Sequence, residues 1–264
     1  MNPQLIAAEV LGCESHLLRA TQIKGGLTNE SWRVDSPDTS VVVRVSTVDE
    51  RALQLDRTNE ALVLKLVEQA GIGPEILLCA PERRLLVTRS LPAKTLAMSH
   101  LDEPSVVQQV AELLRNLHGL KVPAAIHSVH LLSVLEGYWL SLDVRNINSD
   151  MAHRDQARAY AIESSLSSER CLCHHDVHHL NLMSDGRRLW LLDWEYAGIG
   201  DPLFDLASVC CYHEYDKRLR EQLLQAYRGS IIQSELQRLE RMCWLFNYIK
   251  TLWMQVREFQ KHQV

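Results

Sequence analysis

The sequence predicts an α+β protein of two lobes, in which a small antiparallel β-sheet with one helix precedes a larger, mainly helical part. Up to about residue 90 the apolar segments are short and rich in β-branched residues, which is typical of strands. From residue 104 onward apolar residues recur every three or four positions, which is typical of amphipathic helices. Residues 90–93 separate the two patterns and contain a proline, which cannot continue a central strand. We therefore expect an N-lobe of residues 1–90 and a C-lobe of residues 91–264.

Each element follows from the local pattern. In the N-lobe, strands are predicted at residues 17–21, 31–34, 41–45, 76–78 and 85–88, and a helix at about 57–70. In the C-lobe, helical spacing relates Val106, Val110, Leu113, Leu114 and Leu117, and later Leu219, Leu223, Leu224 and Tyr227. A β-hairpin around the turn Asp185-Gly186 is the one expected exception to the helical pattern.

Composition excludes several classes of protein. The chain has 264 residues, of which 46% are hydrophobic and 23% charged, as in ordinary globular proteins. A net charge of −5 argues against a general nucleic-acid-binding protein. No apolar run approaches the ~20 residues of a membrane span, and the start lacks a signal-peptide pattern, so we expect a cytoplasmic protein without membrane association. The seven cysteines include the adjacent pair Cys210 and Cys211, which favours reduced thiols over a disulfide framework.

Two carboxylates and an amide lie close together in the sequence at the spacing that phosphoryl transfer requires. Asp176 and Asn181 share one loop, and Asp193 follows an apolar strand. Transfer of a γ-phosphoryl group needs an acceptor for the proton of the substrate hydroxyl and oxygen ligands for Mg²⁺. Asp176 suits the first role, and Asn181 and Asp193 suit the second.

The predicted hairpin brings these groups together. If the hairpin is centred on Asp185-Gly186, Asp193 lies opposite His178, at the end where the Asp176 loop also lies. The sequence therefore predicts a single polar site at the open end of this hairpin.

The order of these motifs resembles a known family. His174-x-Asp176-x4-Asn181, followed by Asp193, resembles the aminoglycoside phosphotransferase and choline kinase superfamily, which is distantly related to protein kinases. After Asp193 comes Trp194-Glu195-Tyr196 instead of Phe-Gly, which is similar to the choline and thiamine kinase branch. The resemblance implies a protein-kinase-like fold, ATP as co-substrate, Mg²⁺ as cofactor, and supporting roles for His174 and His178 in the catalytic loop.

The N-lobe is expected to bind ATP through a glycine-containing loop. Gly25 and Gly26 lie between two predicted strands, where glycine lets the backbone approach phosphates and present its N–H groups. Thr28 and Asn29 complete the predicted loop site. Residues 25–29 are also similar to the corresponding segment of choline kinases.

Arg44 is the expected phosphate-binding cation. It lies in the strand where kinases carry a phosphate-binding lysine, and its guanidinium can contact phosphate oxygens while it pairs with a helix carboxylate. Glu60 in the predicted helix is the expected partner. Arginine at this place is again similar to choline and thiamine kinases.

Aromatic residues are concentrated in the C-lobe, where five of the six tryptophans lie at or after residue 139. Aromatic faces and carboxylates together bind cationic alcohols such as choline or thiamine. The candidate acceptor-binding residues are Trp194, Glu195, Tyr196, Asp201, Trp139 and Trp244. Residues 131–139 and the tryptophan-rich last helix resemble bacterial thiamine kinases. We therefore expect thiamine as acceptor, with choline or ethanolamine, or an aminoglycoside, as alternatives.

Two other interpretations of the same residues remain open. His174, His175, His178 and His179 lie beside Cys171 and Cys173, and both residue types bind zinc. The two cysteines are closer than in the usual Cys-x2–4-Cys site, which disfavours a zinc-dependent hydrolase. A nucleotide-binding module without turnover is the second alternative, although such a module would not need the clustered acids.

Overall fold

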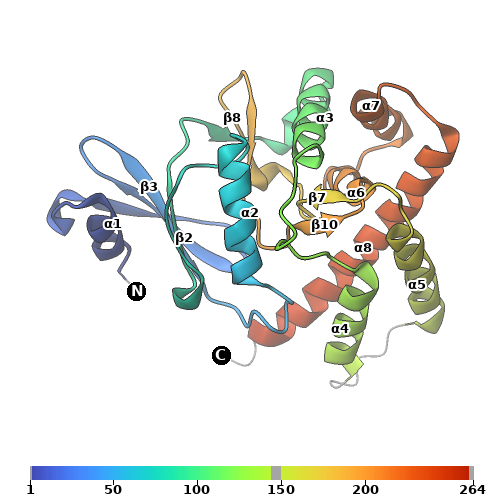
Figure 1. Ribbon diagram of the computed structural model, residues 1–264, viewed down its shortest axis with the longest axis horizontal. Coiled ribbons are helices and arrows are strands. Elements are labelled where there is room, and N and C mark those ends of the chain that lie inside the picture. Colours follow the sequence, from blue (N-terminus) through green and yellow to red (C-terminus); the bar gives the residue numbers. More distant parts are fainter. Residues whose placement is uncertain (1, 144–149, 262–264) are drawn as a thin grey trace.

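The computed structural model describes residues 2–143 and 150–261, and it shows a β-rich part joined to a helical part (Figure 1). The larger sheet is antiparallel with strand order β1-β2-β3-β5-β4. Its strands are β1 (Arg19–Ile23), β2 (Asn29–Asp35), β3 (Ser40–Ser46), β4 (Ile76–Ala80) and β5 (Leu85–Arg89). The predicted α+β class is confirmed.

Two helices cover opposite faces of this sheet (Figure 1). Helix α1 (Pro3–Leu11) packs through Ile6 and Ala7 on strand residues such as Val43. Helix α2 (Arg57–Gln69) covers the other face. Side chains alternate along a strand, so Arg44, next to the buried Val43, lies on the α2 face. This alternation directs the guanidinium toward the helical part of the molecule.

Helix α1 was not predicted, although its start and stop signals are present. The Asn2 side chain accepts hydrogen bonds from the backbone N–H groups of Gln4 and Leu5, Pro3 occupies the first turn, and Gly12 ends the helix in the left-handed conformation. The first strand also begins two residues later than predicted, because Ser15–Leu17 forms a 3₁₀ turn.

The helical part is built around one long helix. Its helices are α3 (Pro104–His118), α4 (Leu131–Asp143), α5 (Met151–Ser165), α6 (Pro202–Tyr212), α7 (Lys217–Arg228) and α8 (Gln233–Lys261). Helix α8 packs against α4, α5 and α6, and α3 packs against α7 (Figure 1). Among the helices of the described residues, none is long and apolar enough to cross a membrane.

Short strands in the helical part hold the loops of the site. The predicted hairpin exists as β8 (Leu182–Ser184) and β9 (Leu189–Leu191), extended by β6 (Lys94–Thr95). Its register pairs Leu182 with Leu191, so the turn covers four residues and Asp193 continues opposite Leu180. The predicted pairing with His178 is therefore wrong. A second small sheet, β7 (Cys171–Cys173) with β10 (Gly198–Gly200), was also not predicted.

Candidate active site

The loop that follows β7 is held by the first turns of α6. The backbone N–H groups of His174 and His175 donate to the two carboxylate oxygens of Asp205, at 2.8 and 2.7 Å. Two residues after His175, the backbone N–H of Val177 donates to Ser208 Oγ at 2.9 Å. Asp205 is fully buried, and these bonds fix the backbone on both sides of Asp176. Asp205 was not among the predicted site residues, and its contacts with the loop become visible only in the structure.

His174 connects the loop to the strand that precedes Asp193. Its Nδ1 accepts the backbone N–H of Asp176 at 3.2 Å, and its Nε2 donates to the carbonyl of Leu192 at 2.8 Å. Burial lowers the pKa of His174, so the ring stays neutral and can serve both as acceptor and as donor. The Asn181 side chain donates to the Asp176 carbonyl at 3.0 Å. The structure thus brings Asp176, Asn181 and Asp193 into one site.

The carboxylate of Asp176 has two polar neighbours. The Tyr212 hydroxyl donates to Oδ1 at 2.7 Å, and His178 Nε2 lies 3.5 Å from Oδ2. Burial raises the pKa of Asp176, but hydrogen bonds from His178 and Tyr212 together hold it below its ordinary value. Asp176 is therefore ionised at neutral pH and can accept a hydrogen bond from a hydroxyl. Sequence reasoning missed Tyr212, which is 36 residues away along the chain.

Asp193 is held in a crowded and partly strained position. Its backbone has a φ of 64°, in the left-handed region, which is uncommon for a residue other than glycine and often marks a functional site. Oδ1 accepts from Arg44 Nη1 at 2.8 Å. Burial and the nearby charge of Glu195 raise the pKa of Asp193 to about 8, in spite of Arg44. The second carboxylate oxygen and the amide oxygen of Asn181 are hard oxygen donors, which fits a Mg²⁺ site.

A chain of alternating charges links the two lobes. Arg44 pairs with Asp193 and, as predicted, with Glu60. Arg57 Nη1 contacts Glu60 Oε2 at 2.7 Å and Glu195 Oε2 at 3.0 Å. Arg57, which sequence reasoning missed, therefore lies between two buried carboxylates. Acids and guanidinium groups alternate in the order Asp193, Arg44, Glu60, Arg57, Glu195, so that each of the two buried carboxylates, Glu60 and Glu195, contacts an arginine.

Glu195 joins the segment after Asp193 to the N-lobe loop. The Thr28 hydroxyl donates to Oε1 at 2.7 Å, and Asn29 Nδ2 donates to Oε2 at 2.9 Å. Since Arg57 also contacts Oε2, both oxygens of this buried side chain are engaged. The prediction that Glu195 contacts the acceptor is wrong, because it is an interlobe anchor. The side chains of Thr28 and Asn29 are engaged in the same way.

The predicted phosphate loop keeps its backbone available. Gly25 has a φ of 106°, and a Cβ atom at Gly26 would lie 2.4 Å from the Asn29 carbonyl, so only glycine fits at these two positions. Arg257 of α8 donates through Nε to the Leu27 carbonyl at 2.9 Å, which ties the loop to the C-lobe. Any contact of this loop with phosphate would come from backbone N–H groups. That role stays a prediction.

Two other proposed acceptor contacts are structural. Trp194 is fully buried, and its ring N–H donates to the Leu191 carbonyl at 3.1 Å. Asp201 caps the start of α6 and pairs with Arg238 at 2.5 Å. Neither side chain presents a free face or oxygen to a substrate. Both residues were predicted as acceptor contacts because they follow Asp193 in the sequence, and this position does not indicate whether a side chain is buried.

Trp139 and Trp244 belong to a separate aromatic cluster between α4, α5 and α8. Arg158 lies over the ring of Trp139, 4.9 Å from its centroid, and Trp244 stacks on Tyr248 at 5.4 Å. The Trp139 ring N–H also donates to the Tyr248 hydroxyl. Trp139 is also buried, so the prediction that it binds the acceptor is wrong, whereas Trp244 is half-buried and its contact with the acceptor stays a prediction.

Tyr212, in contrast, contacts Asp176 directly through its hydroxyl group. Tyr196 is half-buried, and its hydroxyl accepts from the Trp253 ring N–H at 2.7 Å. Burial raises the pKa of all three tyrosines Tyr138, Tyr196 and Tyr212; the charge of Asp176 adds to this at Tyr138 and Tyr212, and the charge of Glu195 adds to it at Tyr196. Tyr212 is therefore the tyrosine that contacts the Asp176 carboxylate. The predicted contact of Tyr196 with the acceptor stays a prediction.

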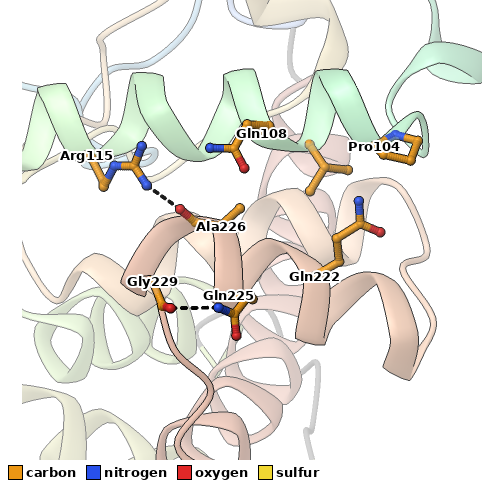
Figure 2. Close-up of a pocket in the computed structure, with 8 residues that line it drawn as sticks. Pro104, Gln108, Arg115, Gln222, Gln225, Ala226 and Gly229 are labelled. Atoms are coloured by element: carbon orange, nitrogen blue, oxygen red, sulfur yellow. Dashed lines mark hydrogen bonds between the residues drawn. The ribbon is translucent and has the colours of Figure 1, made fainter.

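A surface cavity of about 370 Å³ lies elsewhere, between α3 and α7 (Figure 2). Pro104, Gln108 and Arg115 line one side of it, and Gln222 and Gln225 the other. None of the residues that line it belongs to the Asp176 site.

We expect Arg57→Ala to destabilise the protein by about 3 to 5 kcal/mol, because it leaves Glu60 and Glu195 without their shared cation. The free energy of unfolding in urea measures this. As a control, Arg89→Ala removes an exposed ion pair with Glu75 and should change stability little. Equal effects of the two substitutions would contradict the anchoring role of Arg57.

Comparison with known proteins gives a consistent result. A model of the phosphotransferase enzyme family matches residues 19–242. The protein LicA of Haemophilus influenzae is 25% identical over 249 residues, covering 89% of this chain and 72% of that protein. Choline kinase alpha of mouse is 25% identical over 177 residues, covering 60% of this chain and 38% of that protein.

Solved structures confirm the kinase-like fold. The choline kinase LicA of Streptococcus pneumoniae superposes with a TM-score of 0.78 at 20% identity, covering 98% of this chain and 91% of that one. A macrolide 2'-phosphotransferase of Brachybacterium faecium gives a TM-score of 0.65 at 18% identity, covering 92% and 88%. At these identities the structures support the fold alone, and the family model covers most of the sequence. As its motifs suggest, this chain belongs to the phosphotransferase enzyme family.

Proposed function

We propose that the protein is an ATP-dependent kinase that transfers the γ-phosphoryl group to the hydroxyl of a small cationic alcohol. The convergence of Asp176, Asn181 and Asp193 carries this proposal, because it provides a proton acceptor beside oxygen ligands for a metal. A crystal structure of LicA in complex with AMP, at 19% identity and a TM-score of 0.75, adds support for a nucleotide site. Since ATP is the donor, we place the reaction in the cytoplasm.

The proposed mechanism assigns positioning and proton transfer to Asp176. Its ionised carboxylate accepts a hydrogen bond from the acceptor hydroxyl, orients the oxygen toward the γ-phosphorus, and takes the proton late in a loose transition state. Tyr212 and His178 hold the carboxylate in this orientation. Mg²⁺ bound by Asn181 and Asp193 would supply charge compensation for the phosphates.

The N-lobe would hold the donor. Arg44 is positioned by Glu60 and contacts Asp193, so its guanidinium lies at the proposed metal site. On nucleotide binding it would exchange part of this contact for phosphate oxygens, as its planar shape allows. The backbone N–H groups around Gly25 and Gly26 would contact the phosphates as well.

The acceptor is proposed to be choline or ethanolamine. The curated relatives named above include a choline kinase, and the similarities give no support to thiamine, which the sequence alone favoured. The ring of Tyr212, beside Asp176, has a face that attracts a cation, and such a face is worth about 0.5 to 2 kcal/mol. The Tyr212 ring already holds one, since the ammonium of Lys250 lies 4.9 Å from its centroid.

A direct assay tests the function. ADP release with Mg·ATP is measured across choline, ethanolamine, thiamine and an aminoglycoside, and the phosphorylated product is identified by mass spectrometry. We expect choline or ethanolamine to give the highest kcat/KM. If the protein binds Mg·ATP but phosphorylates none of these alcohols, it is a nucleotide-binding module and the proposed acceptor class is wrong.

We expect Arg44→Lys to raise the Michaelis constant for ATP more than it lowers turnover. Lysine keeps the charge but loses the planar fork that contacts phosphate and Glu60 together. Arg44→Ala should impair both parameters. Steady-state kinetics with varied ATP measures the effect, and an unchanged ATP dependence in Arg44→Ala would show that the phosphate-binding cation lies elsewhere.

A further inference from the structure

A second group of metal-binding side chains lies directly before the catalytic loop. It consists of His118 at the end of α3 and of Cys171 and Cys173 on β7. One donor atom from each residue, a ring nitrogen or a sulfur, lies within 4.8 Å of the others. The His118 side chain is 5% exposed, and Cys173 is fully buried. None of these groups takes part in the proposed phosphoryl transfer.

The distance between the two sulfur atoms matches that of two thiolates bound to one metal ion. Residues 171 and 173 are two apart on a strand, so their side chains point to the same face. The sulfur atoms are 3.8 Å apart. A tetrahedral zinc with Zn–S bonds of about 2.3 Å holds two thiolates about 3.8 Å apart. A disulfide requires about 2.05 Å, so the pair would need to shift to form one.

The hydrogen bonds of His118 orient it as a ligand. Its Nε2 lies 3.0 Å from Asp205 Oδ2, and because a carboxylate only accepts, this nitrogen carries the proton. Its Nδ1 therefore has the lone pair, and it accepts from the Tyr227 hydroxyl at 2.7 Å. Metal-binding histidines characteristically donate their second N–H to a carboxylate. His118 has this arrangement before any metal is bound.

We propose that Nδ1 of His118 and the sulfur atoms of Cys171 and Cys173 form a binding site for zinc or a similar soft divalent cation. Water, or the Tyr227 hydroxyl after a small displacement, would complete the tetrahedron. Each thiol releases its proton to solvent when the cation binds. Two protons are then replaced by one divalent charge, so the net charge of the buried site does not change.

The proposed site differs from the Asp176 site in chemistry and in access. Thiolate and imidazole favour zinc, whereas the carboxylate and amide oxygens near Asp176 favour magnesium. The cavity in Figure 2 lies near the proposed zinc site. Two residues that line the cavity show this: Arg115 lies one helical turn before His118, and Ala226 directly precedes Tyr227.

Direct metal titration of the whole chain tests the site. The protein is reduced, stripped with a chelator and titrated with Co²⁺, whose complexes with thiolates absorb in the near ultraviolet. We expect one equivalent of Co²⁺ to bind with thiolate-to-metal absorption, and one equivalent of Zn²⁺ to displace it. Cys171→Ser and Cys173→Ser should each weaken binding by at least about 100-fold.

Two control variants separate this site from the other thiols. Cys79→Ser removes a cysteine of the N-lobe sheet, and Cys243→Ser removes a buried one of α8 whose carbonyl accepts from the Cys211 thiol. Both should bind Co²⁺ as the unmodified chain does. Loss of binding in Cys243→Ser, or full binding in Cys171→Ser, would overturn the proposal. So would the absence of thiolate absorption in the unmodified chain, which does not depend on the folding of any variant or on kinase activity.

Discussion

Asp176→Asn is expected to bind Mg·ATP normally and to turn over about 10² to 10⁴ times more slowly than the unmodified enzyme. The substitution keeps the size of the side chain and a hydrogen-bonding oxygen, but it removes the negative charge that orients the acceptor hydroxyl and takes its proton. Tyr212 and His178 remain to hold the amide, so the loop should keep its shape. Turnover and nucleotide affinity are measured separately, by ADP release and by calorimetry.

A control for this experiment is Asp185→Asn. Asp185 is an aspartate in the exposed β8–β9 turn, where its Oδ1 accepts from the backbone N–H groups of Arg187 and Arg188. An asparagine oxygen can accept the same bonds, so turnover should not change. If Asp176→Asn instead keeps turnover within a few-fold, or loses ATP binding, then Asp176 has a structural role and the proposed mechanism is wrong.

Asp193→Ala is expected to reduce turnover by about 10³-fold or more, the scale of losing a group that stabilises transition-state charge. The substitution removes an anionic metal ligand and one of the two partners of Arg44. Steady-state assays at increasing Mg²⁺ measure the loss. Near-normal turnover of this variant at saturating Mg²⁺ would show that the metal is held elsewhere.

Asn181→Ala provides the comparison. Asn181 would contribute a neutral amide oxygen, which binds Mg²⁺ more weakly than a carboxylate does. Added Mg²⁺ should therefore restore the activity of Asn181→Ala more completely than that of Asp193→Ala. Because the Asn181 amide also donates to the Asp176 carbonyl, a residual defect in kcat at saturating Mg²⁺ is expected from the displaced loop. An equal response of both variants to Mg²⁺ would contradict the different ligand roles.

Much of the fold follows from local patterns. A run of β-branched residues, Val41 to Val43, predicts β3, and the alternation of side chains along a strand places Arg44 on the face that α2 covers. The pairing of Arg44 with Glu60 could therefore be predicted from one strand and one helix. Helix α1 was not predicted although Asn2, Pro3 and Gly12 mark its ends, because its nine residues have only a weak apolar periodicity.

The strand register of the hairpin, and which side chains are free to contact a ligand, were harder to predict. The Asp185-Gly186 pair favours a two-residue turn, but the turn has four residues, 185–188, and this register places Asp193 opposite Leu180. The contact of Tyr212 with Asp176 depends on how α6 packs beside the loop. Neither the secondary-structure propensity of a residue nor the apolar periodicity of a segment indicates such a contact between distant elements.

The sequence by itself determined the two-lobed α+β class and the residue types for phosphoryl transfer, because strand alternation, helical spacing and the interval from Asp176 to Asn181 all act over a few residues. Only the tertiary structure decided which of the acids and aromatic residues are free to meet a ligand. Glu195 is bound by Thr28, 167 residues away along the chain, and Cys171 on strand β7 lies near His118 at the end of helix α3. The physical reason is that burial and charge pairing depend on which distant segments pack together, and the free energy of that packing is shared by the whole chain.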